Sequence, residues 1–392
     1  SNGAPVECVP VAADDLDGLL NFALEHRPGL TVVGPDNPLA MGVVDLFRNH
    51  RLRIWGPDRR AAQFESSKAF AQNFMAVHGV PTAEAGVFTD PHAAKRFAAH
   101  LGGRCAVKAD GLALGKGVLL AENQAEAEKA IDDIMLRRTF GSAGEQVVIQ
   151  ELLRGVEVSL HALCDGHVAR LFPTAQDHKR AFDGDRGPNT GGMGTYSPAP
   201  FLDDDALLDA ARRILEPWQR GCAAEGIDYR GILYPGLMLT EDGPKVLEFN
   251  ARFGDPETQV YLMRLENDLV ELLDASVSGT LKPIELRWRP ASAVCVVMAS
   301  QGYPGSYERG AVIDGLESVA AIPGIKVFHA GTARCGVEFV THGGRVLGVT
   351  ALGDTLAEAR DAAYAAVDLI QFEGAQYRKD IAAKAIELGG VR

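Results

Sequence analysis

The sequence predicts a multidomain fold that combines an α/β region with α+β regions. Three observations support this: helical and strand-like segments alternate at the start, hairpin-type strands dominate the middle, and the composition shifts near residues 283–290. A chain of 392 residues also exceeds the size of one ordinary hydrophobic core. We therefore expect three regions, comprising residues 1–65, 66–282 and 290–392.

The first region is expected to be a small Rossmann-like lobe. Ala12–His26 has leucines at helical spacing, and Pro38–His50 is a second predicted helix. Leu30–Gly34 and Arg53–Gly56 are predicted buried strands, and such alternation indicates a parallel sheet. The sequence opens without a preceding strand, so we expect the first βα unit of this lobe to be missing or truncated.

The middle region is expected to be α+β. A long helix follows Ser66, and further helices are predicted at Pro91–Leu101, Ala125–Arg137 and Thr258–Ser278. Asp165-Gly166 and Asp242-Gly243 are hairpin turn signals. The predicted strands are Arg104–Ala109, Val118–Ala121, Gln146–Leu152, Val156–Cys164, Gly231–Thr240 and Lys245–Asn250.

The last region is expected to be a small α+β domain. A helix is predicted at Thr355–Gln371, and His342-Gly343-Gly344 predicts a tight turn. The predicted strands are Ala291–Ser300, Lys326–Gly331, Val337–Thr341 and Arg345–Leu352.

The composition is that of a globular protein and argues against several classes. Hydrophobic residues make up 46% and charged residues 23%. A formal charge of −13 would repel nucleic acid and anionic membranes. The six cysteines lack zinc-site spacing, and no apolar run is long enough to span a membrane. We expect a cytoplasmic protein with reduced thiols and no nucleic-acid or membrane partner.

The stretch Val-Leu-Glu-Phe-Asn-Ala-Arg-Phe-Gly-Asp-Pro-Glu says most about function. Side chains alternate between the faces of a strand, so Glu248 and Asn250 should share a face with Arg252. Leu247 and Phe249 should face the other way, into a core. Two oxygen ligands beside a cation suit a magnesium ion and a transferring phosphoryl group. A half-buried strand with a wet polar face shows the same alternation, but the abrupt turn that follows favours a ligand site.

Two further segments have the composition of nucleotide-binding loops. From Lys108 to Gly117, a lysine at a strand end precedes a glycine-rich turn with a second lysine, where N–H groups and amines can contact phosphate oxygens. Gln150–Ser159 joins two strands through a polar hinge, where a purine base can pair with backbone groups. Taken alone, a plain hairpin loop explains the first segment equally well, and an ordinary strand connection with solvated glutamates explains the second segment better.

Two polar segments lie in the middle of the chain. Thr174–Arg180 ends in a basic triplet, His178-Lys179-Arg180, which suggests an anion-binding wall. Gly187–Gly194 holds four glycines in eight positions, which predicts no regular element and more hydrogen-bonding groups than a spacer needs. A solvated charged loop and a flexible linker are the alternatives.

Together, the motifs resemble those of the glycinamide ribonucleotide synthetase family, within the ATP-grasp superfamily. The likeness runs from about Val32 to Lys379. It rests on Val33–Pro35, Ser67–Phe70, Lys108–Gly117, Gln176–Arg180, Gly187–Pro198, Leu247–Glu257 and Gly302–Gly305. The combination of Gly-Pro-Asn-Thr-Gly-Gly-Met-Gly with Asn-Ala-Arg-Phe-Gly-Asp-Pro-Glu narrows the resemblance to this family.

The resemblance implies central ATP-grasp lobes that hold ATP between them, with two catalytic residues, Arg252 and Lys108. Glu248 and Asn250 would ligate Mg²⁺, for which Mn²⁺ can substitute. The implied nucleotide-binding residues are Lys68, Lys108, Asp110, Gly111, Gly115, Lys116, Gly117, Glu151, Leu153 and Glu157. The implied substrate-binding residues are Asp177, His178, Lys179, Arg180, Pro188, Asn189, Thr190, Gly191, Gly192, Met193, Gly194, Arg252, Gly254 and Asp255.

The implied activity joins glycine to 5-phosphoribosylamine through glycyl phosphate, in the second step of purine biosynthesis. The products are glycinamide ribonucleotide, ADP and phosphate. An amine cannot displace oxide from a carboxylate, so ATP must first convert the acid to an acyl phosphate; positioning and charge neutralisation then do most of the catalytic work. We expect these two small molecules as its partners and a monomeric enzyme.

The sequence departs from the family pattern in three ways. It has no Gly-Gly-Arg-Glu-His loop for the sugar phosphate, Asp36 stands where glutamate is usual, and Leu237–Leu239 offers no acid for a second metal ion. The alternatives are an ATP-grasp ligase that uses formate or bicarbonate, and a nucleotide-binding module without catalysis. The lack of a Gly-x-Gly-x-x-Gly before the first helix disfavours a dinucleotide-dependent oxidoreductase.

Overall fold

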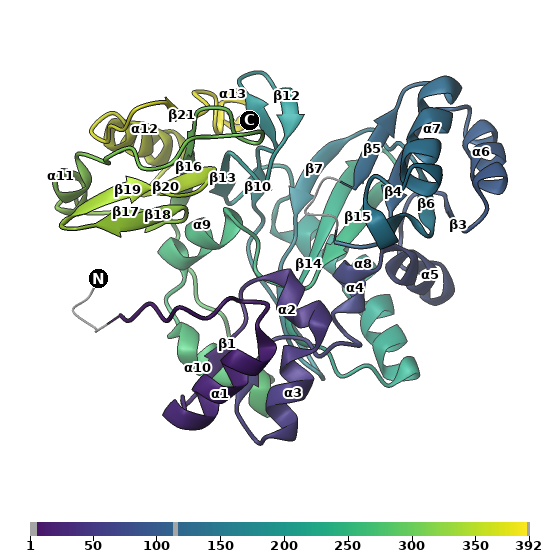
Figure 1. Cartoon of the computed structure of the whole chain (residues 1–392), viewed down its shortest axis with the longest axis horizontal. Coiled ribbons are helices and arrows are strands. Elements are labelled where there is room, and N and C mark those ends of the chain that lie inside the picture. The colour runs from purple at the N-terminus through teal and green to yellow at the C-terminus, as the bar shows by residue number, and fades with distance from the viewer. Residues whose placement is uncertain (1–5, 113–116, 390–392) are drawn as a thin grey trace.

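The computed structural model describes residues 6–112 and 117–389, whose elements group into an N-terminal region, two central lobes and a C-terminal region (Figure 1). In the N-terminal region, β1 (Thr31–Val32) and β2 (Ile54–Trp55) pair in parallel, which confirms the predicted strand direction. The helices of this region are α1 (Leu16–His26), α2 (Asp36–Met41) and α3 (Val43–Asn49).

The first central lobe is built on an antiparallel sheet in the order β3–β6–β4–β5. Its strands are β3 (Ala85–Phe88), β4 (Cys105–Ala109), β5 (Val118–Ala121) and β6 (Val147–Glu151). Helices α6 (Pro91–His100) and α7 (Gln124–Ile131) pack on it through a core of small and branched residues. A π-helical turn at Asp132–Leu136 and a 3₁₀-helix at Gly141–Gly144 follow α7.

The second central lobe is organised around the long strand β14 (Arg230–Thr240). β14 pairs with β15 (Gly243–Asn250), β7 (Val156–Ser159) and β8 (Ala162–Asp165), and β8 pairs with β9 (Ala169–Leu171). Both predicted hairpin turns are confirmed. The single strand predicted at Val156–Cys164 is instead two strands, because β7 and β8 pair with different halves of β14.

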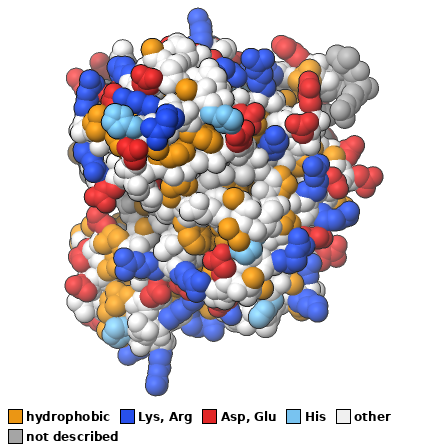
Figure 2. All heavy atoms as spheres, turned by 90° about the vertical axis from the view of Figure 1, so that its right-hand side faces the viewer, with side chains coloured by type: hydrophobic (Ala, Val, Ile, Leu, Met, Phe, Trp, Pro, Cys, Tyr) orange, Lys and Arg blue, Asp and Glu red, His pale blue; other side chains and the backbone are white. Residues whose placement is uncertain are grey.

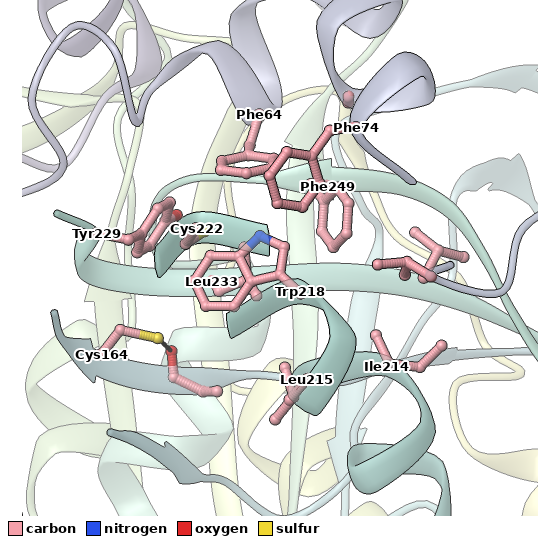
Figure 3. Packing of buried hydrophobic residues seen from close by; sticks show 14 of the residues in the cluster. Phe64, Phe74, Cys164, Ile214, Leu215, Trp218, Cys222, Tyr229, Leu233 and Phe249 are labelled. Carbon is pink, nitrogen blue, oxygen red and sulfur yellow. Dashed lines mark hydrogen bonds between the residues drawn. The ribbon is translucent and has the colours of Figure 1, made fainter. Parts of the chain in front are cut away.

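Buried aromatic rings join the helices of this lobe to its sheet (Figure 3). Phe64 lies at their centre, on α4 (Gln63–Ser66), with ring centroids 4.7 Å from Phe74 on α5 (Lys68–His78) and 5.5 Å from Phe249 on β15. Trp218, from α8 (Asp204–Glu225), lies 5.6 Å from the same ring. This packing places the short helix α4 against the polar end of β15.

The C-terminal region contains a six-stranded sheet in the order β10–β13–β16–β20–β17, with β21 paired to β16. Its strands are β10 (Gln176–Asp177), β13 (Gly194–Ser197), β16 (Ser292–Ser300), β17 (Ile325–His329), β20 (Arg345–Gly353) and β21 (Ala375–Gln376). The helices are α11 (Leu316–Ala320), α12 (Leu356–Val367) and α13 (Ala383–Gly389). Hairpins β11–β12 (Arg180–Phe182, Arg186–Asn189) and β18–β19 (Thr332–Cys335, Glu338–Thr341) complete it.

The sheet of the C-terminal region contains strands from two of the predicted regions. β10 and β13 come from the middle of the chain, yet β13 pairs with β16, where Thr195 lies opposite Cys295. The sheet therefore crosses the boundary expected near residue 290. Pairing between strands 100 residues apart leaves no local pattern in the sequence, because it depends on tertiary packing.

Other predicted elements were also wrong in detail. The helix predicted at Pro38–His50 is instead two helices, α2 and α3, because Gly42 adopts a φ of +94° that ends α2. The helix predicted at Thr258–Ser278 is interrupted between α9 (Glu257–Arg264) and α10 (Leu269–Ser278), because the Asp268 side chain accepts the N–H groups of Val270 and Glu271 and caps a new helix. The glycine-rich segment predicted to be irregular contributes its first three residues to β12 and its last to β13.

Charges of both signs are distributed over the face shown in Figure 2, where acidic and basic side chains are interspersed. None of the helices in the described ranges 6–112 and 117–389 has the length and apolarity needed to cross a membrane.

Candidate active site

Side chains from both central lobes and the N-terminal region line one cavity. Its lining includes Asp36, Phe64, Glu65, Lys68, Ala71, Gln72, Met75, Lys108, Leu112, Val148, Leu247, Glu248, Phe249, Asn250 and Arg252. The structure thus brings together the predicted metal ligands Glu248 and Asn250, the predicted catalytic residues Lys108 and Arg252, and Lys68.

A β-bulge sets the polar edge of β15. Gly236 lies opposite Glu248, whereas Leu237 lies opposite Val246, so Leu247 is the extra residue. Val246 and Phe249 are buried in the core, and Phe249 also reaches the cavity, whereas Leu247 is only half-buried and lines the cavity. The expectation that Leu247 faces the core was therefore wrong, because the bulge interrupts strict alternation.

Lys108 connects the two central lobes. Its Nζ donates to the Leu247 carbonyl oxygen at 2.8 Å. Burial lowers the pKa of Lys108 to about 8; the nearby Glu248 carboxylate opposes this shift, and Lys68 and Lys179 add to it. Lys68 donates to the Gly111 carbonyl oxygen at 3.1 Å. Two amines therefore meet at the cavity, where they can neutralise phosphate oxygens.

Glu248 and Asn250 present oxygen atoms in this basic setting. Burial acts to raise the pKa of Glu248, but Lys179, Lys108 and Lys68 outweigh it and hold the pKa below its usual value. The carboxyl group is thus ionised at neutral pH. The Asn250 amide donates to the Tyr234 carbonyl oxygen at 3.3 Å, which directs its own oxygen towards Arg252.

Arg252 is held by an acid that the sequence analysis missed. Its Nη2 lies 2.9 Å from Oε1 of Glu65, and Oε2 of Glu65 accepts the Ala251 N–H at 2.8 Å. The Glu65 side chain is 9% exposed and that of Arg252 25%. Burial raises the pKa of Glu65, while Arg252 opposes the rise. A lone acid on a four-residue helix has no motif that could have identified it.

Asp110 anchors the glycine-rich loop to helix α5. Its carboxylate accepts hydrogen bonds from the Ser67 hydroxyl at 3.0 Å, the Ala69 N–H at 3.1 Å and the Gln146 amide. Gly117 accepts the Ala109 N–H at 2.8 Å on the other side of the loop. Predicted nucleotide-binding residues Gly115 and Lys116 lie outside the described residues.

The predicted adenine hinge joins β6 to β7. Glu151 ends β6, Leu153 lies in the irregular connection, and Glu157 lies on β7. The Glu157 carboxylate pairs with the Lys179 amine across the second lobe. The acid predicted to bind the ribose and one residue of the predicted anion wall are thus in contact.

The basic triplet does not form a single wall. Lys179 pairs with Glu157, and Arg180 donates to the Gly187 carbonyl oxygen within its own hairpin. His178 is buried, with Nδ1 3.1 Å from the Gly194 carbonyl oxygen, and burial together with the Arg378 charge lowers its pKa to about 4. Each side chain has a different partner, so the expectation of one shared anion site was wrong for the triplet.

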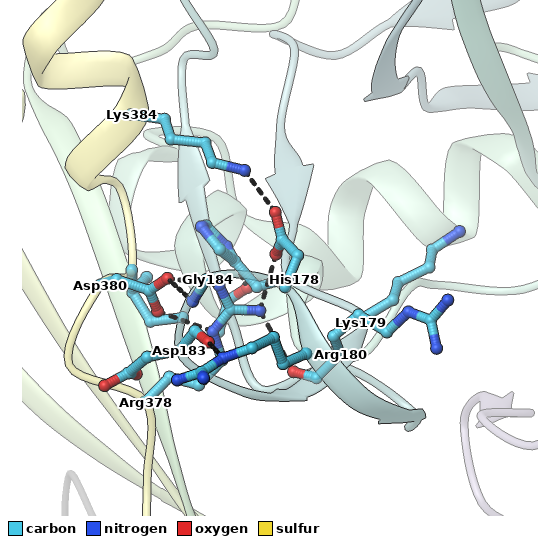
Figure 4. Close-up of polar contacts among 12 residues, drawn as sticks. His178, Lys179, Arg180, Asp183, Gly184, Arg378, Asp380 and Lys384 are labelled. Carbon is cyan, nitrogen blue, oxygen red and sulfur yellow. Dashed lines mark hydrogen bonds and ion pairs between the residues drawn. The ribbon is translucent and has the colours of Figure 1, made fainter. Parts of the chain in front are cut away.

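An ion-pair network lies next to His178 (Figure 4). Arg378 is 1% exposed; it donates to the Arg180 carbonyl oxygen and pairs with Asp185 and Asp380. Asp380 also accepts the Gly184 N–H at 2.8 Å. The network joins the tip of the β11–β12 hairpin to the segment that precedes α13.

Two predicted substrate-binding segments, Asp177–Arg180 and Pro188–Gly194, lie against each other. Thr190 donates from its N–H and hydroxyl to the Lys179 carbonyl oxygen, at 2.7 and 2.9 Å. An added Cβ at Gly192 would lie 2.5 Å from Pro256 and 2.7 Å from the Asp177 carboxylate. Pro188 and Asn189 are exposed, Met193 is buried, Gly194 begins β13, and Gly254 packs against His161 and Glu257.

Three family models match the chain in succession. They describe the N domain (residues 2–65), the ATP-grasp (A) domain (66–258) and the C domain (293–384) of phosphoribosylglycinamide synthetase. The chain belongs to the phosphoribosylglycinamide synthetase family.

Similar proteins support this assignment. The phosphoribosylamine–glycine ligase of Allochromatium vinosum is 51% identical, and the alignment covers 97% of this chain and 89% of that protein. The phosphoribosylamine–glycine ligase of Yersinia pestis is 50% identical, and the alignment covers 98% of this chain and 90% of that protein. The crystal structure of the Thermotoga maritima phosphoribosylamine–glycine ligase aligns with a TM-score of 0.81 at 34% identity, covering 92% of this chain and 88% of that one. A biotin carboxylase domain from Hydrogenobacter thermophilus, which is 17% identical, shares the fold with a TM-score of 0.74. That alignment covers 94% of this chain and 81% of the biotin carboxylase chain.

The cavity of this phosphoribosylglycinamide synthetase family member suits a magnesium ion that arrives with a nucleotide. Across residues 6–112 and 117–389, no group of three or more His, Cys, Asp or Glu residues could form an all-protein metal cage. Mg²⁺ bound to a nucleotide needs only one or two protein oxygens besides phosphate oxygens and waters. The ionised Glu248 and the oriented Asn250 oxygen fit that requirement.

Proposed function

We propose that the chain joins glycine to 5-phosphoribosylamine at the expense of ATP, forming glycinamide ribonucleotide, ADP and phosphate in the second step of purine biosynthesis. One observation carries this proposal: Lys108 from one lobe and Glu248, Asn250 and Arg252 from the other line the same cavity in a member of this family. These groups supply the cations and oxygen ligands that phosphoryl transfer requires.

The reaction has two chemical steps. A glycine carboxylate oxygen attacks the γ-phosphorus of ATP, which breaks the bond to the β,γ-bridging oxygen and releases ADP. The amine of phosphoribosylamine then attacks the carbonyl carbon of glycyl phosphate. Phosphate leaves with the electron pair of the C–O bond, and the amine loses a proton as the amide forms.

The cavity residues provide charge and position for the first step. Lys68 and Lys108 neutralise phosphate oxygens of ATP, and Arg252 stabilises the charge that develops on the transferring group. Glu248 and Asn250 would hold Mg²⁺, which supplies further charge neutralisation at the phosphates. Glu65 keeps the Arg252 guanidinium directed towards this point. Glu151 and Leu153 meet the adenine, and Glu157 meets the ribose.

The remaining predicted residues serve the other two substrates. Lys179 faces Glu248 and Glu157, so its charge lies beside the metal-binding edge. Asp177 packs beside Gly192, and its pKa is raised by burial and by the nearby Glu257 carboxylate. We assign the wall formed by Gly191–Gly194 and Gly254–Asp255 to glycine and the amine.

ADP release tests the proposal. We expect ADP formation that requires Mg²⁺, glycine and phosphoribosylamine together, and glycine hydroxamate when hydroxylamine replaces the amine. Turnover with formate or bicarbonate in place of glycine would assign the chain to another carboxylate–amine ligase activity. ATP binding without turnover would indicate a nucleotide-binding module.

We further propose that Mn²⁺ replaces Mg²⁺, because both ions accept oxygen ligands in octahedral geometry. Metal-dependent turnover in Mn²⁺ alone tests this. We also propose a monomer located in the cytoplasm. The six cysteines are all free, which fits a reducing compartment. Light scattering and cell fractionation test these two points.

A further inference from the structure

Both backbone polar groups of Gly191 are bound by side chains of the C-terminal region. The Gly191 N–H donates to the Tyr303 hydroxyl at 3.0 Å, and Nη1 of Arg345 donates to the Gly191 carbonyl oxygen at 2.8 Å. Arg345 also lies 3.4 Å from the Gly192 carbonyl oxygen. The glycine-rich segment of the middle region is therefore fixed by residues more than 100 positions later.

The same guanidinium binds the turn that follows β15. Nη1 of Arg345 donates to the Asp255 carbonyl oxygen and Nη2 to its Oδ2, both at 2.8 Å. The other carboxylate oxygen of Asp255 accepts the Gln259 amide at 2.9 Å. Both oxygens of this predicted substrate-binding acid are thus engaged within the protein. Asp255 serves as the anchor for Arg345.

The Arg345 guanidinium is closely packed against the glycine-rich segment. A Cβ added to Gly191 would approach both Cζ and Nη2 of Arg345 to 3.1 Å, so the guanidinium packs directly on the glycine. The adjacent Gly192 has a φ of +115°, a backbone conformation that favours glycine, and a Cβ added there would lie 2.5 Å from Pro256 and 2.7 Å from the Asp177 carboxylate. A displacement of Arg345 would therefore also displace Asp177, because Gly191 and Gly192 lie in contact between them.

The backbone of Arg345 is held in place by strand pairing. It begins β20, which is paired on both sides, with β16 and β17. Its side chain is 20% exposed, and planar bidentate donation to a carboxylate and to carbonyl oxygens suits arginine rather than lysine. The first residue of a doubly paired strand thus joins the two motif segments.

We infer that Arg345 is a positioning residue: by binding Gly191, Gly192 and Asp255 together, it sets the wall that receives glycine and the sugar amine. This inference rests on the proposed function of that wall. Arg345 lies outside the cavity that holds Lys68, Lys108 and Glu248, so its role is separate from nucleotide binding.

The test compares Arg345→Gln and Arg345→Lys with wild type in steady-state assays that vary ATP, glycine and phosphoribosylamine in turn. For Arg345→Gln we expect kcat/KM for glycine or the amine to fall about tenfold or more, because charge-assisted hydrogen bonds are lost. The KM for ATP should change by less than about twofold. Arg345→Lys should recover only part of the loss. Exposed Arg287→Gln is the matched control and should behave as wild type.

A double-mutant cycle gives the second readout. Asp255→Asn keeps the side-chain shape but weakens the ion pair, so the effects of Arg345→Gln and Asp255→Asn should be less than additive. Gly191→Ala should reproduce the substrate selectivity of Arg345→Gln. If Arg345→Gln does not fold, Asp255→Asn and Arg345→Lys carry the same comparison.

Equal losses for ATP and the other substrates would overturn the inference, as would unchanged kcat/KM for both glycine and the amine. Full additivity in the cycle would do the same. These outcomes are distinct from failure of the proposed function, which would appear in wild type as turnover with another acid or no turnover.

Discussion

The Glu65 carboxylate contacts both the guanidinium of Arg252 and the backbone of the residue before it, through separate oxygens. The acid comes from helix α4 and the arginine from the turn after β15, so the N-terminal part of the central region orients the group that we propose stabilises the transferring phosphoryl group. The aromatic packing around Phe64 keeps α4 in place.

We predict that Glu65→Gln lowers kcat by about tenfold, because the amide neither fixes the guanidinium nor balances its charge. The KM for ATP should change little, since Lys68 and Lys108 remain. Steady-state kinetics with the three substrates measure both quantities. A change confined to the KM for ATP would contradict the assigned role of Glu65.

Arg252→Lys keeps the charge but loses the planar fork. We predict a fall in kcat of about 100-fold, the size of effect typical of losing a donor that stabilises transition-state charge. ATP affinity should be nearly unchanged in direct binding measurements. Unchanged turnover would remove Arg252 from the mechanism.

Lys108→Met should abolish turnover but stabilise the free enzyme at pH 7. The pKa of Lys108 is about 8 in the folded protein, against 10.5 as its ordinary value, because burial disfavours the ammonium. Between these values the unfolded state binds more protons, so wild-type stability rises with pH. The variant lacks this cost and should be more stable at pH 7 by about 1–3 kcal/mol.

The advantage of Lys108→Met should shrink as the pH rises from about 8 towards 10.5. Urea unfolding at pH 7 and pH 10 measures it. The charges that face Lys108 are those of Glu248, Lys68, Lys179 and Glu157. Lys129→Met, at an exposed lysine of α7, is the control and should show no such pH-dependent gain. A less stable Lys108→Met protein at pH 7 would refute the prediction.

His178 should make the protein sensitive to acid. Its pKa is about 4 when folded and 6.5 ordinarily, because it is buried beside Arg378. As the pH falls from 6.5 to 4, the unfolded state binds the proton first, and stability is lost. We predict that His178→Gln reduces the slope of unfolding free energy against pH in this window, whereas exposed His92→Gln does not. Equal slopes in both variants would rule out His178 as a contributor.

Two substitutions of Trp218 distinguish the contribution of packing from that of hydrogen bonding in the aromatic core. Its ring is buried, yet its Nε1 has no hydrogen-bond partner within the described residues. Trp218→Phe should therefore alter the unfolding free energy by no more than about 1 kcal/mol, since one unsatisfied donor disappears with the lost contacts. Trp218→Ala should lower it by about 3–5 kcal/mol. Denaturant unfolding of the pair distinguishes the two effects.

Sequence reasoning succeeded where the placement of side chains depends on neighbouring residues. Glu248, Asn250 and Arg252 were expected on one polar edge, and they line one cavity with Lys108. Local turn signals also located both central hairpins, since such turns depend on two or three consecutive residues.

It failed where distant segments meet. Glu65 and Arg345 have no motif around them, and their roles follow from pairing with residues 187 and 90 positions away in the chain, at Arg252 and Asp255. The bulge at Leu247 is set by register against β14, which residue alternation cannot reveal. The roles of these side chains are properties of tertiary packing.

The pairing of β13 with β16 limits how the family's domains can be exchanged. A chimera that takes residues 293–384 from a relative would place a foreign β16 beside the native β13, and a foreign residue 345 beside the native Gly191. Domain grafting at the apparent boundary would thus recombine the halves of a single sheet. The C-terminal region and the 176–197 segment should therefore be inherited, and engineered, as one unit.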